Sequence, residues 1–221
     1  MIVTFTYNRL AMLIEQANEL SKIDQSKLII DDESDYPFSN LSKLAKKDPK
    51  LTTVRMHHCG KKGFYKLWDF ALDQCEKSND DFFLFLPDDY TEIDFERIME
   101  THNRLNDRAY VCNVVNDGRP QQWTTAKEQP FDLELTRVDW TDCGFFCNRL
   151  AFDWIGFEVH PVPPIRFTQK GISSGVGEQL TKRWNHAGVP IYRPIKSFAY
   201  HGDHVSVMHP ETRVKQPLIA K

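Results

Sequence analysis

The sequence lacks the features that mark several common classes of protein. No stretch approaches the roughly 18 consecutive apolar residues of a membrane-spanning helix. The formal net charge is -3, so there is no overall positive charge of the kind typical of non-specific nucleic-acid binding. A strand-like pattern begins at Met1 without a charged leader and apolar signal core. We therefore expect a protein without a membrane span that stays in the cytoplasm, the host cytoplasm if a phage encodes it.

Cysteine is also scarce and has no recognisable spacing. The five cysteines are odd in number and form no C-x-x-C pair, which argues against a zinc knuckle and against a secreted disulfide framework. We expect reduced and mostly buried thiols at these positions, which are Cys59, Cys75, Cys112, Cys143 and Cys147.

What the chain does have is a regular alternation of strand and helix patterns. Its 221 residues, 41% hydrophobic and 12% aromatic, suffice for one domain with a substantial core. The expected strands are 2–6, 27–30, 51–56 and 82–86, and helical spacing of apolar residues follows the first three, with Asn8 as a candidate N-cap. This alternation predicts right-handed crossovers and an α/β fold with a mostly parallel central sheet and helices on both faces.

Beyond residue 92 the pattern is looser. We expect a helix over 93–105, strands over 110–115 and 138–148, a polar surface excursion over 121–134, a helix over 177–187 that ends at Gly188, and a strand over 196–199. No internal repeat or interdomain linker is visible, which favours a single domain.

The most informative stretch is 81–90, where an apolar run that fits one buried strand stops at Asp88 and Asp89. Ligands of α/β proteins bind at the carboxyl ends of strands. Two carboxylates there suit Mg²⁺ or Mn²⁺, which in turn can hold a diphosphate. The competing interpretation is a plain turn, since Pro87 and the aspartates are favoured turn residues.

Acidic residues also end two other expected strands. Asp31 and Asp32 follow the second strand, and Asp139 and Asp142 lie near the strand predicted at 138–148. With three acidic clusters at or near strand ends, it is less convincing that the aspartates merely form turns. The pattern instead favours a metal-assisted nucleotide-sugar site.

The order of these motifs resembles the GT-A glycosyltransferases, especially family 2. The matching segments are Thr6-Tyr7-Asn8-Arg9, Asp31-Asp32-Glu33-Ser34-Asp35, residues 60–66 and Leu86-Pro87-Asp88-Asp89. The resemblance covers residues 1–95 well and thins toward 205. It implies a GT-A-like domain over 1–205, with a nucleotide-sugar-binding half (1–95) and an acceptor half (96–205), followed by a C-terminal tail (206–221).

The resemblance also implies roles for residues of the donor half. The residues expected along the nucleotide sugar are Thr6, Asn8, Arg9 and Lys66, with Asp31 or Asp32 at the base or ribose and Asp88 at the ribose or a metal-bound water. Asp89 is the expected ligand of Mn²⁺ or Mg²⁺. Pro87 stands where the family often has an acidic residue, so the D-x-D pattern is incomplete here.

In the acceptor half, Trp140 is the residue expected to stack on the acceptor, and a large core residue is the alternative. Glu178 matches the family's catalytic base, with Asp142 in reserve, although a carboxylate at a helix start also serves as a cap partner. His201, and after it His204, can complete a metal shell in this family, and ordinary loop histidines are the alternative.

These residues predict a metal-dependent, inverting transfer of sugar from a UDP- or GDP-type donor to a glycan or small-molecule hydroxyl. If Glu178 proves remote from the acceptor, a retaining mechanism becomes the better account. Basic and aromatic residues interleave at 61–66, 166–170, 182–184 and 213–215, so glycosylation of a hydroxymethylated pyrimidine in phage-type DNA is the alternative. A nucleotidyltransferase fits less well, because no Gly-rich phosphate loop follows the first strand, and a non-catalytic binding module fits least.

Overall fold

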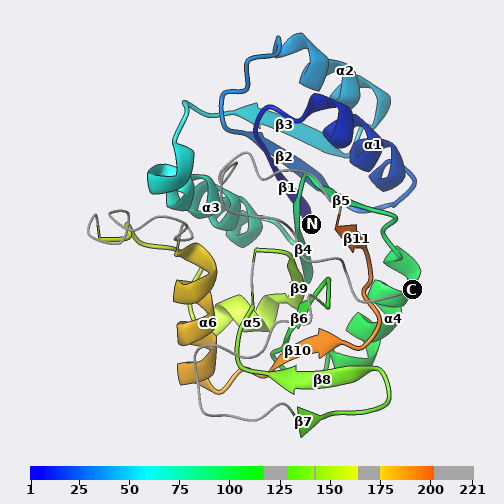
Figure 1. The fold of residues 1–221 in the computed structure, drawn as a ribbon, viewed down its shortest axis with the longest axis vertical. Coiled ribbons are helices and arrows are strands. Elements are labelled where there is room, and N and C mark those ends of the chain that lie inside the picture. Colours follow the sequence, from blue (N-terminus) through cyan, green and yellow to red (C-terminus); the bar gives the residue numbers. More distant parts are fainter. Residues whose placement is uncertain (117–128, 142, 164–174, 202–221) are drawn as a thin grey trace.

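The computed structural model describes residues 1–116, 129–141, 143–163 and 175–201. These residues form a large central sheet with the strand order β3-β2-β1-β4-β9-β6-β10-β8-β7, and a second small sheet of β11 and β5 (Figure 1). The α/β fold with a central sheet between helices is therefore confirmed.

The N-terminal half contains the parallel part of the sheet. Its strands are β1 (Ile2–Thr6), β2 (Lys27–Asp31), β3 (Leu51–Arg55) and β4 (Phe82–Pro87). The helices that connect them are α1 (Leu10–Leu20), α2 (Ser39–Lys47) and α3 (Gly60–Lys77). Both β2 and β4 pair in parallel with β1. The chain thus builds outward from β1 first on one side and then on the other, so the topological switch point lies between β1 and β4.

The C-terminal half extends this sheet with mixed strand directions. In spatial order these strands are β9 (Phe145–Asn148), β6 (Val111–Asn113), β10 (Ile191–Pro194), β8 (Leu135–Val138) and β7 (Gln129–Pro130). β9 is antiparallel to both β4 and β6. The helices here are α4 (Phe95–Leu105), α5 (Arg149–Asp153) and α6 (Val176–Ala187), and the small sheet pairs β5 (Tyr90–Thr91) with β11 (Tyr200–His201).

The sheet buries apolar side chains on both faces because successive strand residues point to opposite sides. Val3 and Phe5 pack with α3, α5 and α6, whereas Ile2 and Leu84 belong to the cluster on the α4 side. Trp68 of α3 is fully buried and stacks 4.8 Å from Phe85. Burial of each such large side chain stabilises the fold by about 1.5–3 kcal/mol. Figure 1 shows α3, α5 and α6 gathered on one side of the sheet, away from α4.

Three local expectations are corrected. The segment 138–148 is not one strand: the chain leaves the sheet after Val138 and returns as β9, three positions away in the strand order. The strand expected at 196–199 is absent, while β10 precedes it and β11 follows it. Asn8 is not the N-cap of α1, because Arg9 holds that position and the Asn8 side chain bonds elsewhere.

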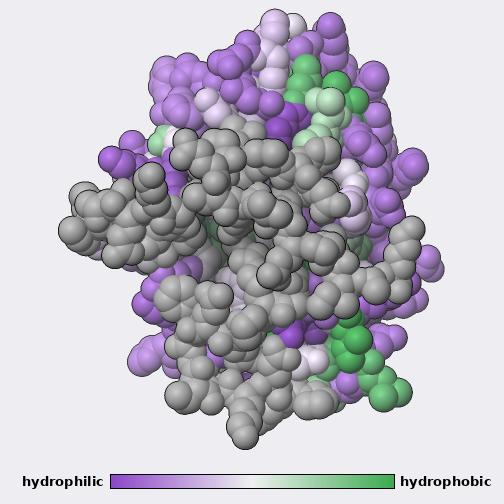
Figure 2. Space-filling view, viewed as in Figure 1, coloured by the Kyte–Doolittle hydropathy of each residue, from purple (hydrophilic) through white to green (hydrophobic). Residues whose placement is uncertain are grey.

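Within the described residues, no helix has the length and apolar character needed to cross a membrane. On the face drawn in Figure 2, the described surface of the N-terminal half is mainly hydrophilic, and apolar residues show in small separate groups. Residues 206–221, interpreted above as a tail, lie outside the described residues.

Candidate functional site

The acidic turn, residues 87–90, follows β4 at the switch point of the sheet. Asp88 and Asp89 are 5% and 6% exposed, so both carboxylates are buried. The hydroxyl of Thr6, at the end of β1, donates to Oδ2 of Asp88 over 2.8 Å, and the Tyr7 N–H donates to the same oxygen over 3.4 Å. The register of β1 on β4 therefore brings Thr6 beside the carboxylate, as the sequence motifs suggested.

Arg9 lies against both carboxylates of the acidic turn. Its Nη1 donates to Oδ1 of Asp88 over 3.1 Å and to Oδ2 of Asp89 over 2.7 Å, and its side chain is 13% exposed. Charge-assisted hydrogen bonds of this kind are strong where water is largely excluded. Arg9 was expected along the nucleotide, and the structure places its guanidinium on Asp88, expected at the ribose or a metal-bound water, and on Asp89, the expected metal ligand.

His201 reaches the same turn from the other end of the chain. Residue His201 of β11 pairs with Tyr90 of β5, and its Nε2 lies 3.3 Å from Oδ2 of Asp89. The ring of Tyr90 packs edge-on against the imidazole, with centroids 5.0 Å apart. The structure thus brings together Asp89 and His201, which are far apart in sequence and were both expected to bind metal. His204 lies outside the described residues.

Burial controls the protonation of the acidic turn. Desolvation raises the pKa of Asp88 to about 6, with Asp89 adding to the rise and Arg9 opposing it. Burial thus disfavours the ionised form of Asp88, and the contact with Arg9 restores part of that loss.

The donor atoms of Asp89 and His201 fit a Mn²⁺ or Mg²⁺ ion. Ligand atoms at right angles around an octahedral ion of this size are about 3 Å apart, and the carboxylate oxygen and imidazole nitrogen are 3.3 Å apart. Oxygen and imidazole together suit Mn²⁺ better than Mg²⁺. Among the described residues no set of three His, Cys, Asp or Glu side chains is arranged to hold a metal, so Asp89 and His201 alone would not complete the ligand shell of such an ion.

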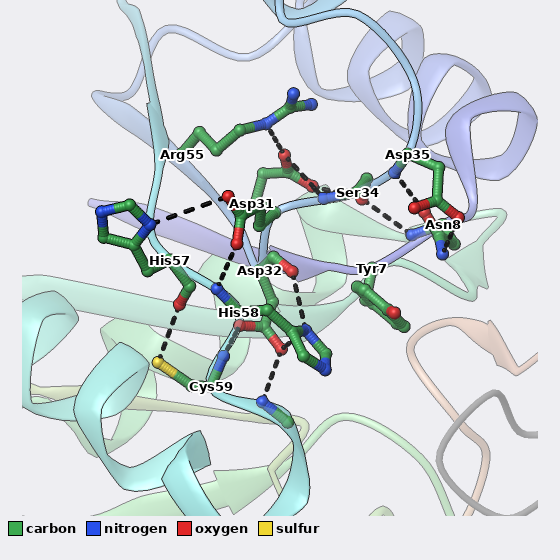
Figure 3. A network of polar contacts seen from close by, with 12 residues as sticks. Tyr7, Asn8, Asp31, Asp32, Ser34, Asp35, Arg55, His57, His58 and Cys59 are labelled. Atoms are coloured by element: carbon green, nitrogen blue, oxygen red, sulfur yellow. Dashed lines mark hydrogen bonds and ion pairs between the residues drawn. The ribbon is translucent and has the colours of Figure 1, made fainter.

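The two aspartates after β2 hold neighbouring loops (Figure 3). The Asp31 carboxylate is fully buried and accepts from Arg55 Nε over 2.5 Å and from the Tyr36 hydroxyl over 3.1 Å. Asp32 accepts the backbone N–H groups of Cys59 (2.6 Å) and Gly60 (3.1 Å). Desolvation nevertheless raises the pKa of Asp32 above its ordinary value. Asp32 thus places its carboxylate at the N-terminus of α3, where the helix dipole favours negative charge.

Beside Asp32, two aromatic rings form the edge of the site. Tyr7 and His58 stack with centroids 4.7 Å apart, and Nδ1 of His58 lies 3.2 Å from Oδ2 of Asp32 (Figure 3). Asn8, with a φ of 55°, donates to Asp35 over 2.9 Å and accepts the Asp35 N–H over 2.7 Å. Asn8 therefore ties the loop after β1 to the loop after β2. Its predicted contact with a nucleotide stays a prediction.

Two residues of the expected acceptor half, Thr141 and Gly144, contact α6 and the acidic turn, respectively. Thr141 N–H donates to the Thr181 hydroxyl over 3.0 Å, which fixes this residue to the second turn of α6. Glu178 lies in the first turn of that helix and accepts from Lys182 over 2.6 Å. At the acidic turn, Gly144 packs so closely on Tyr90 that an added Cβ would lie 2.6 Å from the ring. Asp142, the reserve base, lies outside the described residues.

The structure gives the positions of two other expected site residues, Trp140 and Lys66, but does not test their predicted roles. Trp140 is half-buried, and its carbonyl accepts from Asn113 over 3.2 Å at the end of β6. Lys66 is exposed on α3, two turns into the helix whose N-terminus Asp32 contacts.

Sequence reasoning missed Gln16, which is fully buried on α1. Its Nε2 donates to the carbonyls of Pro87 and Tyr90, each over 2.8 Å, so this amide binds both ends of the acidic turn. A signal was present, because Gln16 shares the buried face of α1 with Leu13 and Leu20, and a polar residue on such a face needs partners. His58 was also missed, because no nearby residue in the sequence indicates that it contacts Asp32 and Tyr7.

The stretch 182–184, one of the four basic and aromatic stretches, keeps its aromatic ring inside the fold. Trp184 is fully buried and its indole N–H donates to the Ala151 carbonyl over 2.9 Å, so it is unavailable for stacking on a base. Arg183 donates to the backbone carbonyls of Ile155 and Glu158. The stretches 166–170 and 213–215 lie outside the described residues.

Comparison with known proteins gives a match in structure alone. No protein-family model matches the sequence, and the search of curated proteins finds no match. The fold is similar to that of S. aureus TarS 1-349, with a TM-score of 0.62 at 14% identity over 91% of this chain and 60% of that one. The complex of TarS 1-349 with UDP-GlcNAc gives a TM-score of 0.63 at 14% identity, over 94% of this chain and 59% of that one. The complex with UDP gives a TM-score of 0.57 at 14% identity, over 87% of this chain and 59% of that one. The chain thus spans about 60% of the length of TarS 1-349 and shares its fold.

Proposed function

We propose that this chain is a glycosyltransferase that binds a nucleoside diphosphate sugar at the acidic turn. One observation carries the proposal: Asp88 and Asp89 end β4 at the switch point beside β1, where Thr6 and Arg9 contact them and His201 approaches Asp89. Open α/β sheets bind their ligands at this place, outside the carboxyl ends of the strands. The shared fold with TarS, which was solved with UDP and UDP-GlcNAc, makes a UDP sugar the first donor to test.

The donor lies, in this proposal, across the ends of β1, β2 and β4. Asp89 and His201 would hold a Mn²⁺ or Mg²⁺ ion, which would supply positive charge to a diphosphate leaving group. The nucleobase of the donor binds beside three residues, Tyr7, His58 and Asp32. The two rings offer a face for stacking, and the carboxylate of Asp32 can accept hydrogen bonds from the nucleobase. Thr6 orients Asp88, and Asn8 keeps the two donor loops together.

Glu178 is the proposed base for inverting transfer. A base of this kind takes a proton from the acceptor hydroxyl as that oxygen attacks the anomeric carbon. Thr141 bonds Thr181 of α6 and Gly144 packs on Tyr90, so the chain passes from α6 to the acidic turn within three residues, which supports a place for α6 near that turn. Oε1 of Glu178 is paired with Lys182 over 2.6 Å, which holds the carboxylate in a defined orientation in the first turn of α6.

Ligand binding tests the proposal most directly. The melting temperature is measured with UDP, GDP, UDP-GlcNAc and other nucleotide sugars, in Mn²⁺ and in EDTA, because a ligand of the native state raises it. We expect a shift that requires Mn²⁺ and disappears in Asp89→Asn. The matched control is Asp73→Asn, which removes an ion-paired carboxylate from the exposed face of α3. Absence of a shift with every nucleotide, in protein with an intact circular dichroism spectrum, contradicts the proposal.

The acceptor is sought next with the donor that binds. Release of nucleoside diphosphate is followed with glycans, small sugars and duplex or single-stranded DNA that contains hydroxymethylcytosine. We expect glycan or small-molecule acceptors to be used, since the buried Trp184 removes one of the aromatic residues on which the DNA alternative was based. Turnover on modified DNA alone would instead establish that alternative.

A further inference from the structure

One oxygen of the acidic turn lies close to nitrogen atoms of two side chains. Oδ2 of Asp89 accepts from Arg9 Nη1 over 2.7 Å and lies 3.3 Å from Nε2 of His201. Of the two Asp89 oxygens it is the one recorded near His201, so a metal ion held by both side chains would lie close to it. The same Arg9 nitrogen also binds Asp88 over 3.1 Å. A metal ion bound by Asp89 and His201 would therefore approach the carboxylate oxygen that Arg9 already contacts.

Burial strengthens the electrostatic interactions among Arg9, Asp88 and Asp89. The side chains of Arg9, Asp88 and Asp89 are 13%, 7% and 8% exposed, so water screens their charges poorly. In such surroundings a buried carboxylate needs a cation, and Arg9 provides it. A divalent ion that arrives at Asp89 without an anion is repelled by the guanidinium next to it. The cost of metal binding alone is therefore the loss or weakening of the Arg9 contact.

A diphosphate changes this balance because it carries enough negative charge for both cations. With its oxygens between them, the metal ion keeps Asp89, and Arg9 keeps Asp88 and gains a phosphate oxygen. Arginine is well suited to such a change, since its five N–H donors can bind a carboxylate and a phosphate at once. The long side chain starts at the N-cap of α1, next to Thr6 and Tyr7 at the switch point.

We propose that Arg9 is an exchangeable counter-ion of the acidic turn, which neutralises Asp88 and Asp89 before the donor arrives and turns to the donor diphosphate when a metal ion takes Asp89. Arg9 thereby opposes binding of the metal alone and favours binding of the metal together with the donor. This inference rests on the proposed function. It assigns to Arg9 a coupling between two ligands rather than a contact with the reacting atoms.

Metal binding without donor is the diagnostic measurement. Mn²⁺ affinity is measured from the paramagnetic relaxation of water protons for the wild type, for Arg9→Met and for Arg9→Gln, each with and without saturating UDP. We expect both variants to bind Mn²⁺ alone about tenfold more tightly than the wild type, and UDP to improve their Mn²⁺ affinity by a smaller factor, because coupling between two ligands is typically of this size and is reciprocal.

The variants are chosen so that a folding defect does not obscure the result. Arg9→Gln removes the charge but keeps N–H donors for the two carboxylates, and it replaces Arg9→Met if the latter does not fold. Arg104→Met is the matched control, since Arg104 is an exposed arginine on α4 that pairs with Asp132 and Glu134. This control should bind Mn²⁺ and UDP as the wild type does.

The outcomes separate this inference from the proposed function. If the Arg9 variants bind Mn²⁺ alone no more tightly than the wild type, while Mn²⁺ and UDP still bind together, the exchange role is wrong and the donor site stands. If neither the wild type nor any variant binds Mn²⁺, with or without UDP, then the metal site itself is wrong and the exchange fails with it.

Discussion

The side-chain amide of Gln16 holds the backbone of Tyr90 in place. Its Nε2 donates to the Tyr90 carbonyl over 2.8 Å and also to the Pro87 carbonyl, while its Oε1 accepts from the Thr4 hydroxyl over 2.8 Å. One buried amide from α1 thus fixes both ends of the acidic turn to β1. The positions of Asp88 and Asp89 therefore depend on a residue that touches neither carboxylate.

We predict that Gln16→Leu lowers the free energy of unfolding by about 2 kcal/mol or more, since each buried polar group left without a partner costs about 1–3 kcal/mol. Urea denaturation measures this loss. The variant should also bind Mn²⁺ and UDP more weakly at temperatures where it is fully folded. Gln74→Leu is the control, because Gln74 donates to the neighbouring Asp73 on the surface of α3. A Gln16→Leu protein that is destabilised but binds both ligands normally would show that Gln16 stabilises the fold without positioning the turn.

Gly144 is predicted to be essential to the packing of Tyr90. A Cβ at this position lies 2.6 Å from both Cε2 and the hydroxyl oxygen of Tyr90, far inside van der Waals contact. Gly144→Ala must therefore displace the ring and, with it, the edge contact to His201. We expect a loss of about 1–3 kcal/mol in the free energy of unfolding, as for other overpacked sites, and weaker Mn²⁺ binding.

A double-mutant cycle checks the cause of this loss. In a Tyr90→Ala background the clash is absent, so Gly144→Ala should cost much less there than in the wild type. Equal costs in the two backgrounds would assign the effect to the backbone of residue 144 instead of to Tyr90.

Much of the site could be expected from sequence because it lies at strand ends. The apolar run before Asp88, and the alternation of strands and helices before it, were sufficient to place Thr6, Asp88 and Asp89 at one edge of a sheet. A position of His201 near Asp89 was expected only from the family resemblance. Nothing in the sequence around His201 indicates that β11 pairs with β5 next to Asp89.

The errors in the predicted elements can be explained physically. Strand β10 lies within the sheet, yet Pro190 and Pro194 bracket it and proline normally argues against an inner strand. The run 138–148 looked continuous because Val138 and the apolar residues of β9 stand at its two ends, and Gly144 is the chief sign in the sequence of a break between them. Arg9 was expected on the nucleotide, and its place on the two aspartates follows from burial of those carboxylates, which a sequence pattern does not show.

Stability at mildly acid pH should depend on His102. This buried side chain of α4 has its Nδ1 2.7 Å from the Tyr110 hydroxyl and packs edge-on against Phe82. Desolvation lowers the pKa of His102, with Asp81 opposing the shift and the N-terminal ammonium adding to it. The unfolded chain therefore takes up this proton first, and the contribution of His102 to stability is complete above about pH 6.5, the ordinary pKa of histidine, and is lost as the pH falls below it.

Urea denaturation at pH 7.5 and pH 5.5 measures this effect. We expect the wild type to lose more stability over this interval than His102→Gln, which keeps a polar partner for Tyr110 but does not titrate. Comparison of the two proteins at each pH removes the contribution of Asp88, whose raised pKa acts in the opposite direction. Identical losses in both proteins would exclude His102 as a source of the pH dependence.

Glu178 offers a test of the chemistry that is separate from donor binding. It lies in the first turn of α6 and accepts from Lys182, a contact that the amide oxygen of glutamine can also make. Glu178→Gln therefore preserves shape and this hydrogen bond but removes the proton acceptor. We expect the rate of transfer to the identified acceptor to fall by about 10²–10⁴-fold, the usual contribution of a general base, while the affinity for the donor is unchanged.

The matched control is Glu96→Gln, which changes a glutamate in the first turn of α4, away from the acidic turn. Both variants are assayed for turnover by release of nucleoside diphosphate and for donor affinity by titration. Lost turnover with intact binding in Glu178→Gln alone identifies the base, because a structural cap would change stability and leave the chemistry in place. Retained turnover would transfer the role to Asp142 or require a retaining mechanism, and the anomeric configuration of the product distinguishes these two.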